Sequence, residues 1–174
     1  MLDVLKRIVR GGVLTEPVPP AADAGAEIER LQAAVLEVLG RALCIRHVDA
    51  GSCNGCELEI HALNNPYYNL EGHGVRFVAS PRHADLLLVT GPVSVNMEEA
   101  LRRTHAATPD PKLVVAVGDC GACGGVFGES YASRGAVSRV IPVDVTVSGC
   151  PPAPLAILQG ILAATRGRPA AVTR

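Results

Sequence analysis

The chain has 174 residues, of which 48% are hydrophobic and 19% are charged. This balance excludes a disordered, highly charged chain and predicts a globular protein large enough to fold without disulfides or metals. The formal net charge of −1 and the absence of tryptophan give neither the basic surface nor the stacking platform of a nucleic-acid binder. We therefore expect no nucleic-acid partner.

The first residues do not resemble a signal peptide, because Asp3, Lys6 and Arg7 interrupt any apolar run. No later apolar segment approaches the ~18–20 residues that span a bilayer. These features predict a cytoplasmic chain, in which thiols stay reduced. The six cysteines therefore indicate metal binding or catalysis ahead of disulfides.

Residues 1–42 are expected to form an amino-terminal arm. Glycines and prolines break any long element up to about residue 24. Residues 27–43 then predict an amphipathic helix, with these apolar side chains on one face: Ile28, Leu31, Val35, Val38, Leu39 and Ala42. This helix packs either on its own domain or on another subunit.

In residues 43–166, short apolar runs alternate with helical segments. The expected strands are Leu43–Asp49, Val75–Ala79, Asp85–Thr90, Leu113–Val117 and Val140–Val147. The expected helices are Glu57–Asn64, Met97–Ala107 and Ala153–Ala164. This alternation predicts an α/β domain with a parallel sheet covered by helices on both faces, followed by a carboxyl-terminal tail at 167–174.

Three glycine-bearing cysteine turns follow three of these strands, at Gly51–Cys56, Gly118–Gly125 and Ser148–Pro152. In an open parallel sheet the carboxyl ends of all strands lie at one edge, where ligands bind. Cysteines from distant parts of the sequence are therefore expected to converge at that edge.

Four thiolates at one edge suit an iron–sulfur cluster or a zinc ion. Structural zinc usually uses two short Cys-x-x-Cys knuckles, whereas Cys120 and Cys150 enter singly from separate loops. The Cys150-Pro151 pair is also a feature of cluster-binding runs, so a [4Fe–4S] cluster is favoured. A thioredoxin-like use of Cys53 and Cys56 as redox thiols would leave the other two cysteines unexplained.

Two cysteines remain outside this set. Cys44 lies within a predicted buried strand, where a free thiol packs as a small hydrophobic side chain. Either Cys120 or Cys123 could serve the cluster, and Cys120 is preferred because it lies closer to the end of its strand. Cys123 would then be a neighbouring or spare thiol.

Four blocks in this order carry a family resemblance: GSCNGCELEI at 51–60, SPRHADLLLVTG at 80–91, GDC…GG at 118–125 and PVDVTVSGCPP at 142–152. They resemble the cluster-carrying small subunit of energy-converting nickel–iron hydrogenases and formate hydrogenlyases. The same blocks are similar to the homologous 20-kDa (B-type) subunit of respiratory complex I. The resemblance covers about residues 43–164.

The resemblance implies a flavodoxin-like domain with one [4Fe–4S] cluster at the carboxyl edge of its sheet. Its ligands would be Cys53, Cys56, Cys120 and Cys150. Complex I subunits of this type carry adjacent cysteines, whereas Asn54-Gly55 separates the first pair here, as in hydrogenase small subunits.

The expected function is thus electron transfer within a membrane-associated hydrogenase or formate hydrogenlyase-type complex. The alternative is the B-type subunit of an NADH–quinone oxidoreductase, which reduces quinone. A zinc-stabilised interaction module without redox activity is a third interpretation.

The resemblance also implies partners. They are a large catalytic subunit, of the nickel–iron hydrogenase or complex I 49-kDa type, a ferredoxin-like cluster subunit and membrane subunits. The chain would then lie peripherally on the inner face of the cell membrane. Because it offers no nickel site or nucleophile–base pair, we expect it to be inactive alone.

Several other side chains have two interpretations. Glu57 and Glu59 begin a predicted helix, where acidic groups interact favourably with the positive end of the helix dipole. By the resemblance, Glu59 matches a glutamate beside the cluster that is thought to relay protons. Arg82 either pairs with Asp85 to fix a turn or, by the resemblance, contacts the large subunit. No metal-ligand spacing is evident among the histidines His47, His61, His73 and His105.

Overall fold

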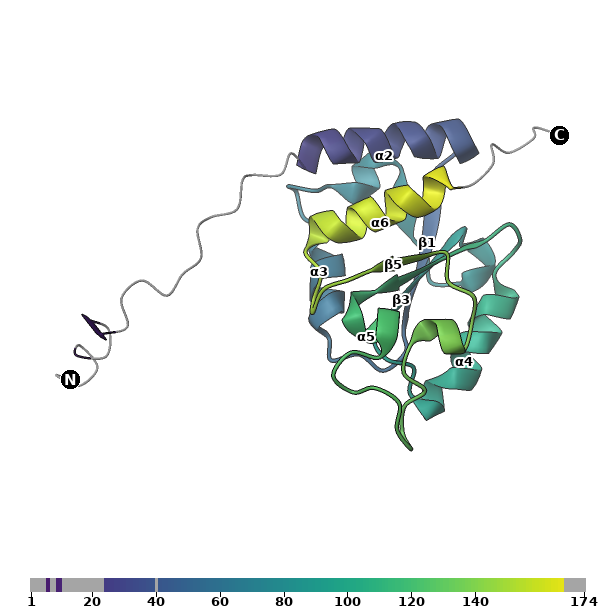
Figure 1. The fold of residues 1–174 in the computed structure, drawn as a ribbon. Helices are drawn as coiled ribbons and strands as arrows, with labels where there is room; N and C mark the ends of the chain where they lie inside the picture. Colours follow the sequence, from purple (N-terminus) through teal and green to yellow (C-terminus); the bar gives the residue numbers. More distant parts are fainter. Residues whose placement is uncertain (1–5, 7–8, 11–23, 40, 168–174) are drawn as a thin grey trace.

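The structure is a computed structural model that describes residues 6, 9–10, 24–39 and 41–167. The expected irregular segment before residue 24 lies almost entirely outside this part, as does the expected tail. Five parallel strands form one sheet in the order β2-β1-β3-β4-β5 (Figure 1). Their bounds are β1 Leu43–Asp49, β2 Val75–Phe77, β3 Leu86–Thr90, β4 Leu113–Val117 and β5 Val145–Val147.

Helices connect the strands and cover both faces of the sheet. The α-helices are α2 Ala24–Leu39, α3 Gly55–Ala62, α4 Val95–Ala107, α5 Gly118–Cys123 and α6 Pro154–Arg166. Three short 3₁₀ helices are η1 Leu70–His73, η2 Pro81–His83 and η3 Val137–Arg139. The strand order is that of flavodoxin-like folds, so the predicted fold class is confirmed. No helix in the described residues is both long and apolar enough to cross a membrane.

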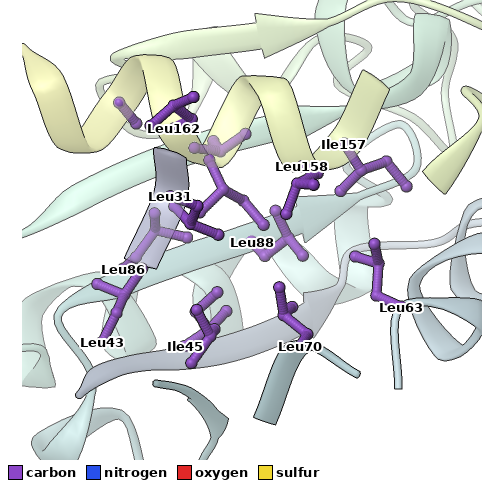
Figure 2. Packing of buried hydrophobic residues seen from close by; sticks show 14 of the residues in the cluster. Leu31, Leu43, Ile45, Leu63, Leu70, Leu86, Leu88, Ile157, Leu158 and Leu162 are labelled. Atoms are coloured by element: carbon purple, nitrogen blue, oxygen red, sulfur yellow. The ribbon is translucent and has the colours of Figure 1, made fainter. Parts of the chain in front are cut away.

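One core lies between the sheet and the pair α2 and α6, which run side by side across one face (Figure 1). Leu86 and Leu88 of β3 point to this face, and Leu31 of α2 packs on them. Figure 2 shows this layer, with these residues labelled: Leu31, Leu43, Ile45, Leu63, Leu70, Leu86, Leu88, Ile157, Leu158 and Leu162. The amphipathic helix thus packs on its own domain.

A second core lies on the opposite face, where Leu87 and Val89 of β3 meet Leu101 of α4. Side chains in β3 and β4 are buried at every position, because alternate residues enter one core or the other. Val140 and Ile141 also belong to the second core. The strand expected over 140–147 begins only at Val145, because the earlier apolar residues are buried by packing and form no ladder.

Two aspartates set the register at the amino ends of strands. Asp85 precedes β3; its N–H donates to the carbonyl of Cys44 (2.8 Å) and its carboxylate accepts the Cys44 N–H (3.0 Å). Asp144 precedes β5 and makes the same reciprocal pair with Val114, at 2.9 and 2.7 Å. Each pair of hydrogen bonds fixes the register between two neighbouring strands.

Of the two interpretations of Arg82, the prediction of an ion pair with Asp85 is wrong. Arg41 instead donates two hydrogen bonds to the Asp85 carboxylate, at 3.0 and 2.6 Å. The Arg82 side chain is exposed on η2. The partner of Asp85 comes from 44 positions earlier, a distance over which local sequence gives no signal.

Candidate metal centre

The first cysteine loop follows β1 and is built on one carboxylate. Asp49 Oδ1 accepts the N–H groups of Gly51 and Ser52, both at 2.8 Å. The Ser52 hydroxyl accepts the Asn54 N–H at 3.1 Å. These bonds turn the chain so that Cys53 lies exposed at the edge and Cys56 begins α3 half-buried.

The second and third loops follow β4 and β5, which are neighbours in the sheet. Cys120 lies half-buried in α5, and Cys150 lies exposed between β5 and α6. Asp119 joins the loops: its N–H donates to the Gly149 carbonyl, and its carboxylate accepts the Gly149 N–H. The turn that the sequence predicted around Cys120 is therefore a short helix tied to the next loop.

Glycines make room around the cysteine sulfurs. A Cβ at Gly118 would lie 2.7 Å from the Cys56 sulfur, and one at Gly125 would lie 2.8 Å from the Cys120 sulfur. A Cβ at Gly55 would lie 3.6 Å from the Cys53 sulfur and 3.8 Å from the Pro151 ring, which follows Cys150. The three loops are thus in contact, as the sheet topology predicts.

The thiols act on one another electrostatically. Burial raises the pKa of Cys56 to about 11, and negative charge at Glu57, Cys120, Cys53 and Cys150 adds to the effect. The pKa of Cys120 is also raised, first by burial and then by Cys150 and Cys53. Thiolate charge at Cys56 and Cys120 would therefore be stabilised by a positive group beside them, such as a bound metal would supply.

No three His, Cys, Asp or Glu side chains of the described residues gather closely enough to hold a single metal ion. A four-iron core has a different requirement, because each cysteine binds a separate iron atom and the ligands stand further apart than around one zinc.

The two remaining cysteines lie outside this set. The Cys123 side chain is exposed, and its thiol donates to the carbonyl of Asp119 at 3.2 Å, within α5. Cys44 lies at the start of β1, near Arg41 and Asp85. It is therefore at the amino ends of the strands, opposite the cysteine loops. It is half-buried, which is less than the sequence predicted for a core thiol.

Glu57 is the buried carboxylate at this edge, with 7% of its surface exposed. Its Oε2 accepts the Ser52 hydroxyl at 2.5 Å. Its Oε1 lies 3.6 Å from His47 Nε2 and accepts no hydrogen bond from the described residues. Sequence reasoning assigned Glu57 only to the helix dipole, because its contact with His47 crosses from α3 to β1.

Glu59 lies three positions after Cys56 on α3, so both side chains lie on neighbouring parts of the helix surface. Glu59 is half-buried, and its charge contributes to the raised pKa of Tyr68. Glu59 thus lies about one helical turn along α3 from Cys56, one of the expected ligands.

Burial lowers the pKa of His47 below 6.5. The nearby negative charges of Glu57 and Asp49 raise this pKa, and the positive charges of Arg46 and His61 lower it. The unfolded chain therefore binds a proton on this ring more readily than the folded chain does. We expect the free energy of unfolding to fall as the pH drops from about 7 to 5.

The His47→Gln variant should lose less stability over this range, because glutamine does not titrate. Urea unfolding at several pH values, under anaerobic conditions, measures the difference. The exposed His83→Gln serves as the control and should keep the wild-type slope. An identical slope in His47→Gln and wild type would show that His47 titrates alike in both states.

Comparisons with known proteins show the family of the chain. The family model for the 20-kDa subunit of NADH ubiquinone oxidoreductase matches residues 53–164. A probable membrane-bound hydrogenase subunit of Pyrococcus furiosus is 48% identical over 137 residues, which are 79% of this chain and 82% of that protein. Formate hydrogenlyase subunit 7 of Escherichia coli is 42% identical, but the match spans 83% of this chain and only 56% of the relative.

An NADH-quinone oxidoreductase subunit from Herpetosiphon aurantiacus is 46% identical over 62% of this chain and 60% of its own length. A chain in the structure of the membrane-bound sulfane sulfur reductase, an archaeal respiratory membrane complex, matches with a TM-score of 0.64. It is 32% identical and the match covers 79% of this chain and 74% of that one. The chain therefore belongs to the family of the 20-kDa subunit of NADH ubiquinone oxidoreductase.

Proposed function

We propose that this chain binds one [4Fe–4S] cluster through Cys53, Cys56, Cys120 and Cys150. In this role it transfers electrons within a membrane-associated hydrogenase or formate hydrogenlyase-type complex. The observation that carries the proposal is the contact between the three loops that bear these cysteines, where β1, β4 and β5 end. When bound, the cluster would supply one-electron redox chemistry, and the chain would hold and orient its ligands.

The site fits a cluster in two further respects. Gly118 and Gly125 place bare backbone against the ligand sulfurs, where any larger side chain would displace them. The half-buried sulfurs of Cys56 and Cys120 lie in surroundings that disfavour thiolate charge, so a positive iron core is what stabilises them there.

Two observations favour the hydrogenase type over the quinone-reducing type. Asn54-Gly55 separates the first two cysteines, as the resemblance implies for hydrogenase small subunits. The relative from Pyrococcus furiosus, a probable membrane-bound hydrogenase subunit, matches over most of both chains. The alternative is a B-type subunit of an NADH–quinone oxidoreductase, supported by the relative from Herpetosiphon aurantiacus.

Exposed apolar side chains near the site suit contact with a large catalytic subunit. Leu58 follows the Cys56 turn on α3 and is 61% exposed; Phe127 and Val126 follow Gly125 and are 55% and 89% exposed. Where such side chains form one contiguous patch, they mark an interaction surface. A ferredoxin-like cluster subunit and membrane subunits would complete the assembly and place this chain on the inner face of the membrane.

Anaerobic co-purification with the large subunit tests the proposal. We expect about four sulfide per chain from this cluster, at least about four iron with further iron from the nickel–iron site, a reduced-cluster signal in low-temperature EPR, and nickel in the large subunit. Iron and sulfide without nickel, together with quinone reduction, would favour the complex I-type alternative. A colourless chain with one zinc ion would overturn both and leave an interaction module.

We also propose that Glu59 relays protons beside the cluster. The Glu59→Gln variant should retain iron and the EPR signal but lower the turnover of the assembled complex by at least about tenfold, the lower part of the range for a lost proton-transfer group. The matched control is Glu71→Gln, an exposed glutamate on η1, which should keep full turnover. Unchanged turnover in Glu59→Gln would remove this residue from proton transfer.

A further inference from the structure

The loop that contains Cys150 is weakly supported by the sheet. The loop follows β5, which has three residues. β5 is the outermost strand of the sheet and pairs only with β4. The last ladder pair joins Val117 to Val147, so Cys150 lies beyond the hydrogen-bonded strand. Another contact must fix the direction of its sulfur.

Asp119 makes that contact from the helix that contains Cys120. Its backbone N–H donates to the Gly149 carbonyl (2.9 Å), and its Oδ1 accepts the Gly149 N–H (2.7 Å). The two hydrogen bonds run in opposite directions and hold both backbone polar groups of Gly149, the residue that precedes Cys150, so the peptide groups on both sides of Gly149 are fixed. A carboxylate acceptor makes the second bond stronger than a neutral acceptor would.

We propose that Asp119 is a positioning residue, which holds the Cys150 sulfur toward its iron atom through the bond from Gly149 N–H to Oδ1. This inference rests on the proposed function, because it requires the cluster. The carboxylate stands close to the ligands, since its charge is among the smaller causes of the raised pKa of Cys120. Its negative charge repels the thiolates, so its value there is geometric.

The chain provides a matched control. Asp144 makes the same reciprocal pair between the same two neighbouring strands, with Val114, at 2.9 and 2.7 Å. It lies at their amino end, opposite the cysteine loops. Asp144→Ala therefore removes an equivalent bond without touching the site.

The test compares Asp119→Ala, Asp119→Asn and Asp144→Ala in the anaerobically purified complex, with cluster loss as the readout. Ferricyanide accepts one electron from the [4Fe–4S]²⁺ core, which releases one Fe²⁺ and leaves [3Fe–4S]⁺, and EPR follows that product. An iron atom whose cysteine ligand is poorly held is lost faster. We expect about tenfold faster conversion in Asp119→Ala, the effect of losing a hydrogen bond to a charged acceptor.

Asp119→Asn keeps an Oδ1 acceptor but loses the charge, so it should convert at a rate between those of wild type and Asp119→Ala. Asp144→Ala should convert at the wild-type rate. Equal rates in Asp119→Ala and Asp144→Ala would overturn the proposal, and so would an Asp119→Asn variant as labile as Asp119→Ala. If Asp119→Ala does not fold, Asp119→Glu decides, because it keeps the charge but moves the acceptor away from Gly149. A wild-type complex without iron would instead refute the cluster itself.

Discussion

Replacing Cys120 by serine should remove the cluster, whereas the same replacement at Cys123 should leave it in place. Cys120 is half-buried and Gly125 leaves room beside its sulfur, whereas the Cys123 thiol donates to the carbonyl of Asp119 within its own helix. Because the thiolate is the ligand that iron requires, Cys120→Ser should lower bound iron from about four atoms per chain to less than about one. Cys123→Ser keeps a hydroxyl donor for the helix carbonyl.

Iron and sulfide analysis of the anaerobically purified chains, with EPR of the reduced samples, measures the difference. Cys44→Ser is a second control, since this thiol lies at the amino ends of the strands, opposite the cysteine loops, and it should retain full iron. Iron lost from Cys123→Ser but kept in Cys120→Ser would exchange the roles of the two residues. Iron retained in both would mean that neither is required.

The sequence predicted the sheet better than its connections. β1 and β4 have the predicted bounds, because continuous apolar runs of this length are what a buried parallel strand requires. The strand expected from Val140 begins later, since an apolar run also satisfies burial without a ladder. The helix α5 was expected to be a turn, because glycines are read locally as breaks while tertiary contacts decide the outcome here.

The convergence of the cysteine loops was predictable because it depends only on topology. The carboxyl ends of parallel strands lie together, whatever the separation of the strands in sequence. The residues that shape this site were not. Glu57 meets His47 across two elements, and Asp119 meets Gly149 across 30 positions. Each contact depends on how distant elements pack in the folded chain, which no local pattern encodes. The only sequence signals were the acidic residues that directly flank the cysteines.

Gly118→Ala should reduce cluster binding by at least about half while the chain still folds. Gly118 has φ +82°, which costs a residue with a Cβ about 1–2 kcal/mol, and that Cβ would lie 2.7 Å from the Cys56 sulfur. In the cluster-free chain the sulfur can rotate away. Once it must bind iron, its position is fixed and the clash cannot be relieved. We expect less than about half of the wild-type iron content, with a loss in unfolding free energy of about 1–2 kcal/mol.

Gly74→Ala separates the two effects. Gly74 also has φ +82°, but a Cβ there would have no atom within 4 Å. Urea unfolding should therefore show a similar loss of stability in both variants, whereas iron analysis should show a loss of iron in Gly118→Ala alone. Equal iron in both would mean that the Cys56 sulfur need not stay beside Gly118 when iron binds. A loss of iron in both would make backbone strain, and not the space left for the sulfur, the limit on cluster binding.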